Sequence, residues 1–242
     1  GGKMALLAGV GPMGLAAINY AIHRQDRKPK LMIVTDIDQA RLDRAAQLYS
    51  PEEAAGNGIE LIYINTGKME HPVNELKTLS GGEGYDDVFV FAPVVPIIEQ
   101  ADDILAVDGC LNFFAGPAKT DFKALFNFYN VHYARTHIVG TSGGNKDDMI
   151  EALDVMSKGV DPAGLVTHIG GINAVIATTM NLPSIPGGKK LIYTHIDMPL
   201  TAISDFEEKG KTDPLYAELH KLCAANKGLW NVEAEEFLLA NS

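Results

Sequence analysis

The chain alternates short apolar segments with longer amphipathic ones from residue 4 to about residue 165, and this alternation limits the folds open to it. Apolar residues fill nearly every position of the short segments, which is typical of parallel strands covered on both faces. The pattern therefore predicts layered α/β structure. The six predicted strands are Met4–Ala8, Leu31–Thr35, Glu60–Asn65, Asp87–Phe91, Cys110–Phe114 and His137–Gly140.

Amphipathic segments between these strands predict helices. Three of them begin with a proline, which the first turn of a helix tolerates. Strand and helix repeated in this order form a doubly wound parallel sheet, so we expect the α/β class. The predicted helices are Pro12–His23, Asp38–Tyr49, Pro72–Leu79, Pro96–Leu105 and Lys146–Lys158.

The pattern changes near Leu165, where regular alternation ends. We expect a dinucleotide-binding domain over residues 1–164 and a C-terminal return segment with a helical extension over 165–242. The predicted elements of this segment are a helix at Ile172–Leu182, a strand at Lys189–Thr194, and two short helices at Pro214–Ala225 and Val232–Ala240.

Charge and cysteine content exclude several classes of protein. A net charge of −11 disfavours nucleic acid as a partner, and no segment approaches the roughly 18 apolar residues of a membrane helix. Cys110 and Cys223 form neither a disulfide framework nor a zinc-ligand spacing, which indicates a reducing, cytoplasmic setting. Gly1-Gly2-Lys3 leads directly into an apolar strand, so we expect a portion of a longer protein.

The strongest motif is the glycine-rich turn Gly9-Val10-Gly11-Pro12-Met13-Gly14 between the first strand and the first helix. In a Rossmann fold, Gly9 would permit the tight turn, Gly11 would let backbone amides approach a pyrophosphate, and Gly14 would allow close packing of helix and strand. The helix N-terminus supplies free N–H groups for phosphates. A glycine turn without a ligand is the alternative.

An acidic residue stands where a dinucleotide site needs one. Asp36 ends the second strand, 22 residues after Gly14, and its carboxylate would accept hydrogen bonds from the adenosine ribose. Such a carboxylate favours NAD and repels the 2′-phosphate of NADP. Ile37 and Arg41 follow it, and Arg41 could pair with a phosphate, which leaves NADP possible. Asp36 could instead cap the next helix, a role that Asp38 could also fill.

Small residues follow three later strands. Ala92-Pro93, Ala115 and the turn Thr141-Ser142-Gly143-Gly144 stand at carboxyl ends of strands, where ligands bind to open α/β sheets. We therefore expect Ala92, Pro93, Ala115 and Ser142 to contact the cofactor.

Catalytic residues are not evident in the sequence. There is no Tyr-x-x-x-Lys pair in a suitable place, and the seven histidines show no metal-ligand spacing. His168 and His195, beside apolar strands, are the better functional candidates, without an assigned mechanism. We expect no metal site in the chain.

Aromatic residues are dense between Phe113 and Tyr133. Apolar and aromatic residues alternate over Phe126–Tyr133, and an edge strand is expected just beyond. The pattern predicts self-association through residues 126–139, into a homodimer or tetramer, with ordinary core packing as the alternative.

These motifs together resemble a known family. The glycine turn, with proline after its second glycine, resembles the cofactor loop of medium-chain, zinc-type alcohol and polyol dehydrogenases. Val34–Asp38 with Arg41 is similar to that family's ribose-binding strand end. Val139–Gly144 is similar to its turn that holds the nicotinamide amide.

Other segments resemble one branch of that family. Thr167–Ile169 and the later Gly188–Ile192 are similar to the family's closing segment. Asn112–Pro117, Asn127–Tyr133 and Pro186–Thr194 are similar to the L-sorbose 1-phosphate reductase branch. The resemblance implies hydride transfer between a nicotinamide cofactor and a polyol or sugar phosphate, with L-sorbose 1-phosphate reduced to glucitol 6-phosphate.

The resemblance also implies an N-terminal, GroES-like domain that nothing in this chain matches. That domain carries the zinc ligands and most of the substrate pocket, so zinc would act only in the complete enzyme and this portion alone would be inactive. Two other hypotheses remain: a stand-alone nucleotide-sensing module without catalysis, and, less favoured, an S-adenosylmethionine-binding domain.

Overall fold

The computed structural model describes residues 2–140 and 142–242. The chain divides into two compact units, unit 1 over Gly1–Val160 and unit 2 over Asp161–Ser242. Each unit is considered by itself below. No helix in the described part of the chain is long and apolar enough to cross a membrane.

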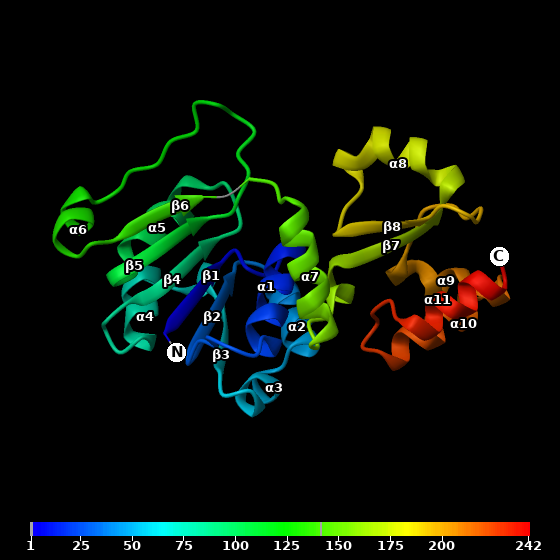
Figure 1. The fold of residues 1–242 in the computed structure, drawn as a ribbon, viewed down its shortest axis with the longest axis horizontal. Coiled ribbons are helices and arrows are strands. Elements are labelled where there is room, and N and C mark those ends of the chain that lie inside the picture. Colours follow the sequence, from blue (N-terminus) through cyan, green and yellow to red (C-terminus); the bar gives the residue numbers. More distant parts are fainter. Residues whose placement is uncertain (1, 141) are drawn as a thin grey trace. The chain divides into compact units, whose positions relative to one another are not determined.

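Unit 1 contains a six-stranded parallel sheet in the order β3-β2-β1-β4-β5-β6 (Figure 1). The chain runs outward from β1 to β3, returns, and runs outward from β4 to β6 in the opposite direction. This is the doubly wound order of a Rossmann-like fold, so the predicted fold class is confirmed. The strands are β1 (Lys3–Leu7), β2 (Leu31–Asp36), β3 (Glu60–Asn65), β4 (Tyr85–Val90), β5 (Leu105–Phe113) and β6 (His137–Gly140).

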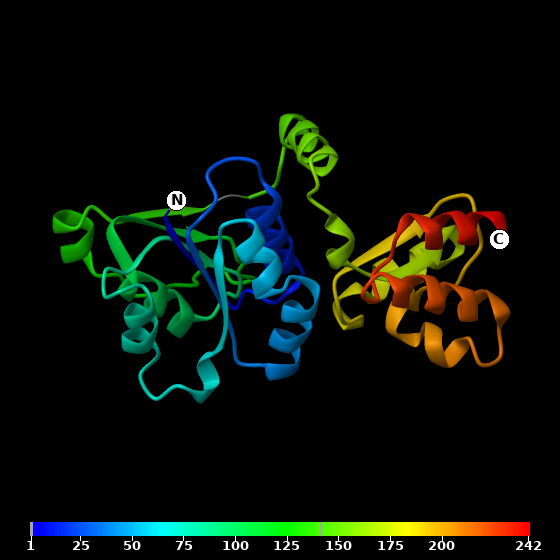
Figure 2. The same ribbon diagram turned by 90° about the horizontal axis from the view of Figure 1, so that it is seen from below.

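Helices connect these strands and flank the sheet (Figures 1 and 2). Two short helices, α3 and α6, were not expected from the sequence. The helices are α1 (Pro12–His23), α2 (Gln39–Leu48), α3 (Pro51–Gly56), α4 (Pro72–Leu79), α5 (Val95–Asp103), α6 (Phe128–Tyr133) and α7 (Lys146–Ser157), with a 3₁₀ turn at Thr66–Lys68.

One face of the sheet carries the main core of unit 1. Alternate residues of a strand point to opposite faces, and on this face Ala5, Val88 and Leu111 pack with Leu76 of α4 and Ile98 of α5. Residues 122–126 add Phe122 and Phe126 to the same cluster. The opposite face of β1 and β2 is also fully buried, through Leu6, Met32 and Val34.

The aromatic segment that precedes the edge strand is helical in part. Phe128–Tyr133 forms helix α6, whose first turn is capped by Asn127, so the alternation of aromatic residues here belongs to a short helix that was not predicted. The edge of the sheet is β6, which follows α6 after three residues. Strand β5 also begins earlier than expected, at Leu105, because a bulge containing Asp108 in a left-handed conformation interrupts its pairing with β4.

Unit 2 contains a three-stranded sheet in the order β8-β7-β9, flanked by helices. The expected helices near residues 175–181, 214–225 and 232–240 are present. The elements are β7 (Val166–Gly171), α8 (Val175–Asn181), β8 (Lys189–Tyr193), β9 (Thr201–Ala202), α9 (Phe206–Lys209), α10 (Pro214–Ala225) and α11 (Val232–Ala240), with 3₁₀ turns at Pro162–Leu165, Ile172–Ala174, Leu182–Ser184 and Ile203–Asp205.

A buried aromatic cluster joins β8 to the C-terminal helices of unit 2. The Trp230 Nε1 donates to the Tyr193 hydroxyl at 2.9 Å, and that hydroxyl donates to Glu235 Oε2. Burial, together with Glu235, raises the pKa of Tyr193. The tail is therefore an integral part of the unit 2 core.

Replacing Tyr193 with Phe should lower the free energy of unfolding of unit 2 by about 1–3 kcal/mol. The substitution keeps the ring and leaves the Trp230 N–H and the Glu235 carboxylate without this partner. Denaturant unfolding followed by fluorescence of Trp230, the single tryptophan of the chain, measures the change. An unchanged midpoint would show that water replaces the hydroxyl at no cost.

Candidate functional site

The glycine-rich turn lies between β1 and α1, as predicted. The Gly9 N–H donates to the Thr35 carbonyl at 2.9 Å, which ties the turn to the end of β2. Ala8, directly before it, has a φ of 52°, a left-handed conformation that non-glycine residues rarely adopt and that often occurs at functional sites. Gly11 is the N-cap residue of α1 and no side chain caps this helix, so its first N–H groups are free for a ligand.

Two glycines of the turn have opposite surroundings. A Cβ on Gly14 would lie 1.9 Å from the Gly9 carbonyl oxygen, so only glycine lets α1 approach the turn this closely. A Cβ on Gly11 would meet only the Arg41 Nη2, at 3.5 Å. The backbone at Gly11 therefore forms an open ledge: space beside it is free, and a ligand group could approach the backbone amides of α1 there. Pro12 and Met13 form the first turn of that helix.

Asp36 ends β2 and its side chain is 8% exposed. Its Oδ1 accepts hydrogen bonds from the backbone N–H groups of Ile37 and Asp38, at 2.9 and 3.1 Å. Asp38 caps α2 by accepting from the Arg41 N–H, so Asp36 is not the helix cap. The second carboxylate oxygen of Asp36 accepts no hydrogen bond from the residues that the structure describes.

Arg41 connects the two parts of the site. It lies in the first turn of α2, and its guanidinium is beside Gly11, as the close approach of Nη2 shows. Ile37, directly after Asp36, is exposed. The structure thus places a carboxylate, a guanidinium and a free helix N-terminus around the carboxyl ends of β1 and β2.

A hollow of about 680 Å³ lies at the ends of β5 and β6. Two predicted residues, Ala115 and Ser142, line it, whereas Ala92 and Pro93 do not. Thr141 lies outside the described residues. Sequence reasoning missed the aromatic walls Phe113 and Phe114, whose only signal is their position at the end of a parallel strand. The remaining lining residues are Gly116, Pro117, Gly140 and Gly143.

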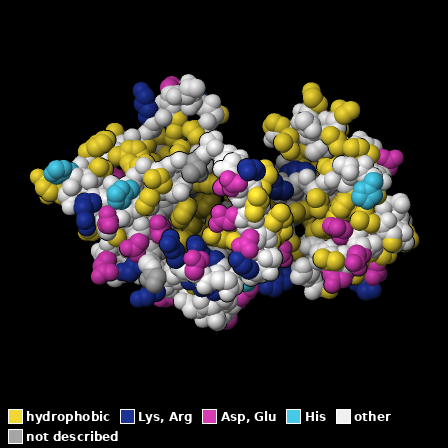
Figure 3. All heavy atoms as spheres, viewed as in Figure 1, with side chains coloured by type: hydrophobic (Ala, Val, Ile, Leu, Met, Phe, Trp, Pro, Cys, Tyr) yellow, Lys and Arg dark blue, Asp and Glu magenta, His cyan; other side chains and the backbone are white. Residues whose placement is uncertain are grey.

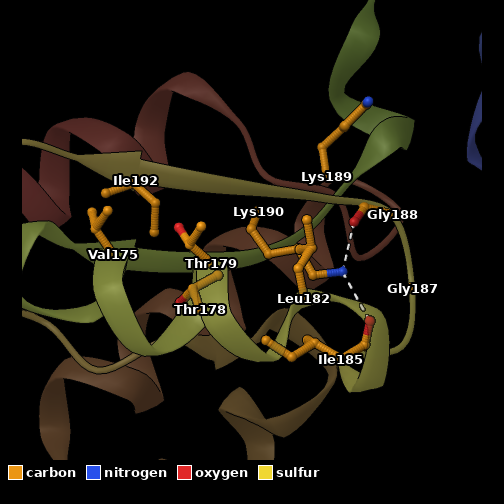
Figure 4. A pocket seen from close by; sticks show the side chains of 10 residues that line it. All are labelled: Val175, Thr178, Thr179, Leu182, Ile185, Gly187, Gly188, Lys189, Lys190 and Ile192. Atoms are coloured by element: carbon orange, nitrogen blue, oxygen red, sulfur yellow. Dashed lines mark hydrogen bonds between the residues drawn. The ribbon is translucent and has the colours of Figure 1, made fainter.

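A second hollow, of about 450 Å³, lies in unit 2 between α8 and β8 (Figure 4). Thr178, Thr179 and Lys190 are among its lining residues. The Lys190 Nζ donates to the carbonyls of Pro186 at 2.9 Å and Gly188 at 2.7 Å, with a longer contact to Ile185. Lys190 therefore closes the 185–188 turn and has no donor left for a ligand.

The histidines do not form a catalytic or metal group among the described residues. His168 is buried in unit 2, its Nδ1 contacts the Thr167 hydroxyl at 2.9 Å, and burial, with nearby Lys190, lowers its pKa. His132 lies on α6, and His137 contacts Asp108 on the surface. Within residues 2–140 and 142–242, no three His, Cys, Asp or Glu side chains come together as metal ligands do.

The strand order and the glycine turn define the class of Rossmann-like α/β proteins. More narrowly, the chain belongs to the zinc-binding dehydrogenase family, whose sequence profile matches residues 12–158. The described residues do not fit a zinc site, so no zinc chemistry is assigned to them.

Curated relatives cover the whole chain. It is 53% identical over 240 residues to a mannitol-1-phosphate 5-dehydrogenase of Aliivibrio fischeri, covering 99% of this chain and 56% of the relative. It is 46% identical over 242 residues to an L-sorbose 1-phosphate reductase of Klebsiella pneumoniae, covering 100% of this chain and 55% of the relative. The chain thus spans about half the length of the curated relatives it matches.

Solved structures share the fold. A 2R,3R-butanediol dehydrogenase of Bacillus subtilis has a TM-score of 0.61 at 20% identity, covering 81% of this chain and 51% of that one. An alcohol dehydrogenase of Escherichia coli, solved with NADH, has a TM-score of 0.57 at 17% identity. The match covers 79% of this chain and 51% of that one.

Proposed function

We propose that this chain is the cofactor-binding portion of a dehydrogenase that exchanges hydride between a nicotinamide cofactor and a sugar phosphate or polyol. Two relatives named for 1-phosphates support this substrate class, and the reduction of L-sorbose 1-phosphate to glucitol 6-phosphate is the specific reaction we propose. No observation favours a module that only senses nucleotides. The cysteines Cys110 and Cys223 are both free, in keeping with a reducing cytoplasm.

The observation that carries this proposal is the joint placement of the glycine turn and Asp36. The pyrophosphate would lie on the ledge at Gly11, against the free N–H groups of α1 and the positive end of its dipole. The free oxygen of Asp36 would accept from the ribose hydroxyls, and Arg41 would neutralise a phosphate oxygen. Because a 2′-phosphate would meet the Asp36 carboxylate, we propose NAD rather than NADP.

The hollow at β5 and β6 suits the nicotinamide end of the cofactor. Its walls combine the rings of Phe113 and Phe114 with the small residues Ala115 and Gly140, which leave space for a flat ring and exclude water from it. When bound, the nicotinamide would supply the hydride. Ser142 offers a hydroxyl for its carboxamide.

Titration calorimetry of the 242-residue chain with NADH and NADPH tests the cofactor assignment. We expect saturable binding of NADH and at least tenfold weaker binding of NADPH, because of the charge on Asp36. No binding of either nucleotide would contradict the proposal, and equal affinities would remove the discriminating role from Asp36. Assay of the full-length gene product with both 1-phosphates then tests the reaction.

We also propose that unit 1 forms dimers through β6 and α6. The outer edge of β6 has unpaired backbone groups, and Phe128, Tyr129 and Tyr133 of α6 are exposed beside it, Phe128 by 75%. Exposed edges of this kind are normally covered, and a two-fold contact would cover both copies at once.

Replacing Phe128 with Lys is expected to shift the sedimenting species from dimer to monomer, because the charge would be buried at the contact. Ile176→Lys, at an exposed apolar position on α8, is the matched control and should leave the dimer intact. Dimers that persist in the Phe128 variant would place the contact elsewhere.

A further inference from the structure

Helix α7 has an apolar face that no other part of the described chain covers. Met149, Ile150, Leu153 and Met156 lie on one side of the helix and are between 44% and 67% exposed. The opposite side carries acidic residues: Asp147, Asp148, Glu151 and Asp154. A capping box between Asn145 and Asp148 stabilises the first turn, so the two faces of the helix are well defined. Such a helix normally buries its apolar stripe.

Among the residues that the structure describes, nothing covers one partly apolar face of the unit 1 sheet at β4–β6. On β4, β5 and β6, the core cluster with α4 and α5 covers one face only. The other face presents Phe89, Cys110 and Val139, together with Phe114 just beyond β5; Val139 is 44% and Phe114 40% exposed. The polar residues Asp87, Asn112 and His137 lie on the same face, in the same register rows. Figure 3 shows hydrophobic side chains gathered on unit 1 around a hollow. Parallel sheets are almost always covered on both faces.

We propose that α7 closes over this uncovered face of β4–β6 as a strap, with its acidic side left in water. The helix lies on the side of the sheet opposite α4 and α5, which is the side of the open face (Figures 1 and 2). It is also the next element of the chain after β6.

Chain length permits this closure. Five residues separate Gly140 from Lys146 and can span about 17 Å, more than the roughly 10 Å step from a sheet to a helix packed on it. If α7 ran antiparallel to β6, Leu153 would lie about 10 Å along the helix axis from the start of the helix. Cys110 pairs with His137, the first residue of β6, and this pair lies about 10 Å along the strand from the carboxyl end of β6. Leu153 would thus face Cys110, which lies between Asp87 of β4 and His137 of β6 in the same register row.

Closure would also fix one wall of the cofactor hollow. Gly140 and Ser142 line that hollow and stand at the start of the connection to α7. A second copy of the chain, or another partner, could cover the same face instead, and the experiment below separates these cases.

Cross-linking tests the strap. In a Cys223→Ser background, Leu153→Cys should form an intramolecular link to Cys110 with a short bis-maleimide, whereas Glu151→Cys, on the acidic side of α7, should not. Mass spectrometry of the monomer band identifies the link. Absence of the link, equal linking of both variants, or linked dimers alone would overturn the proposal, and linked dimers would identify a second copy as the cover.

A second measurement needs no added cysteine on α7 and follows the rate at which the native Cys110 thiol is alkylated. Leu153→Asp should speed alkylation of Cys110 at least tenfold, because the strap would no longer shield the thiol. Glu151→Asp should leave the rate unchanged. Equal rates in both variants would contradict closure, and circular dichroism checks that the fold is retained in each.

Discussion

Replacing Gly14 with Ala is expected to weaken NADH binding about a hundredfold and to lower the free energy of unfolding of unit 1 by about 3 kcal/mol. The added methyl group would lie 1.9 Å from the Gly9 carbonyl oxygen, so either α1 or the turn must move. Because the backbone of α1 fixes the position of the Cβ and the Gly9 oxygen is itself a backbone atom, no rotamer change can relieve the clash. Titration with NADH and denaturant unfolding measure the two effects.

Gly11→Ala is the matched control for this substitution. Its methyl group would meet only the Arg41 guanidinium at 3.5 Å, so stability should change by no more than about 1 kcal/mol. NADH affinity should still fall, because the methyl group would occupy the ledge proposed for the pyrophosphate. Unaltered affinity in Gly11→Ala would show that phosphates do not approach the turn there.

Asp36→Asn is expected to weaken NADH binding by about 1.5–3 kcal/mol, which is roughly 10- to 150-fold. Asn keeps an oxygen that can accept from the N–H groups of Ile37 and Asp38, so the strand end should keep its shape. The charge that favours the ribose hydroxyls is lost. NADPH affinity should rise relative to NADH, since the repulsion of a 2′-phosphate is removed.

Asp38→Asn provides the comparison for that experiment. Asp38 caps α2, and Asn caps helices as well as Asp does, so both stability and NADH affinity should be retained. If both variants bind alike, the charge at Asp36 has no part in choosing the cofactor.

Much of unit 1 could be predicted because its signals are local. Six apolar segments gave the six strands within a few residues, except β5, and their alternation with helices gave the doubly wound class. The start of β5 at Leu105 was missed because it depends on a bulge at Asp108, and left-handed backbone at an aspartate has no clear sequence signature. Helix α6 was not predicted because a six-residue segment is too short to separate a period of 3.6 from one of 2.

Some features of the candidate site could likewise be predicted from local sequence, and others could not. The glycine turn lies between β1 and α1, and Asp36 ends β2, as the sequence predicted; the two come together since parallel strands bring their carboxyl ends to one edge. The approach of Arg41 to Gly11 and the aromatic walls Phe113 and Phe114 depend on how separate elements pack. Helix α3 had readable signals that the prediction overlooked, with Ser50 as cap, Pro51 in the first turn and two glutamates after it.

The strand order has a consequence for how the protein is made. Strand β1 pairs with β2 on one side, but its other neighbour is β4, whose residues Asp87–Val90 follow about eighty positions later. During synthesis, β1 therefore waits with one side open until β4 leaves the ribosome, and the first three strands cannot close the core alone. Pairings between such distant segments are slow to form. A ribosome that stalls before Val90 would hold a chain with an exposed apolar strand, a natural substrate for chaperones.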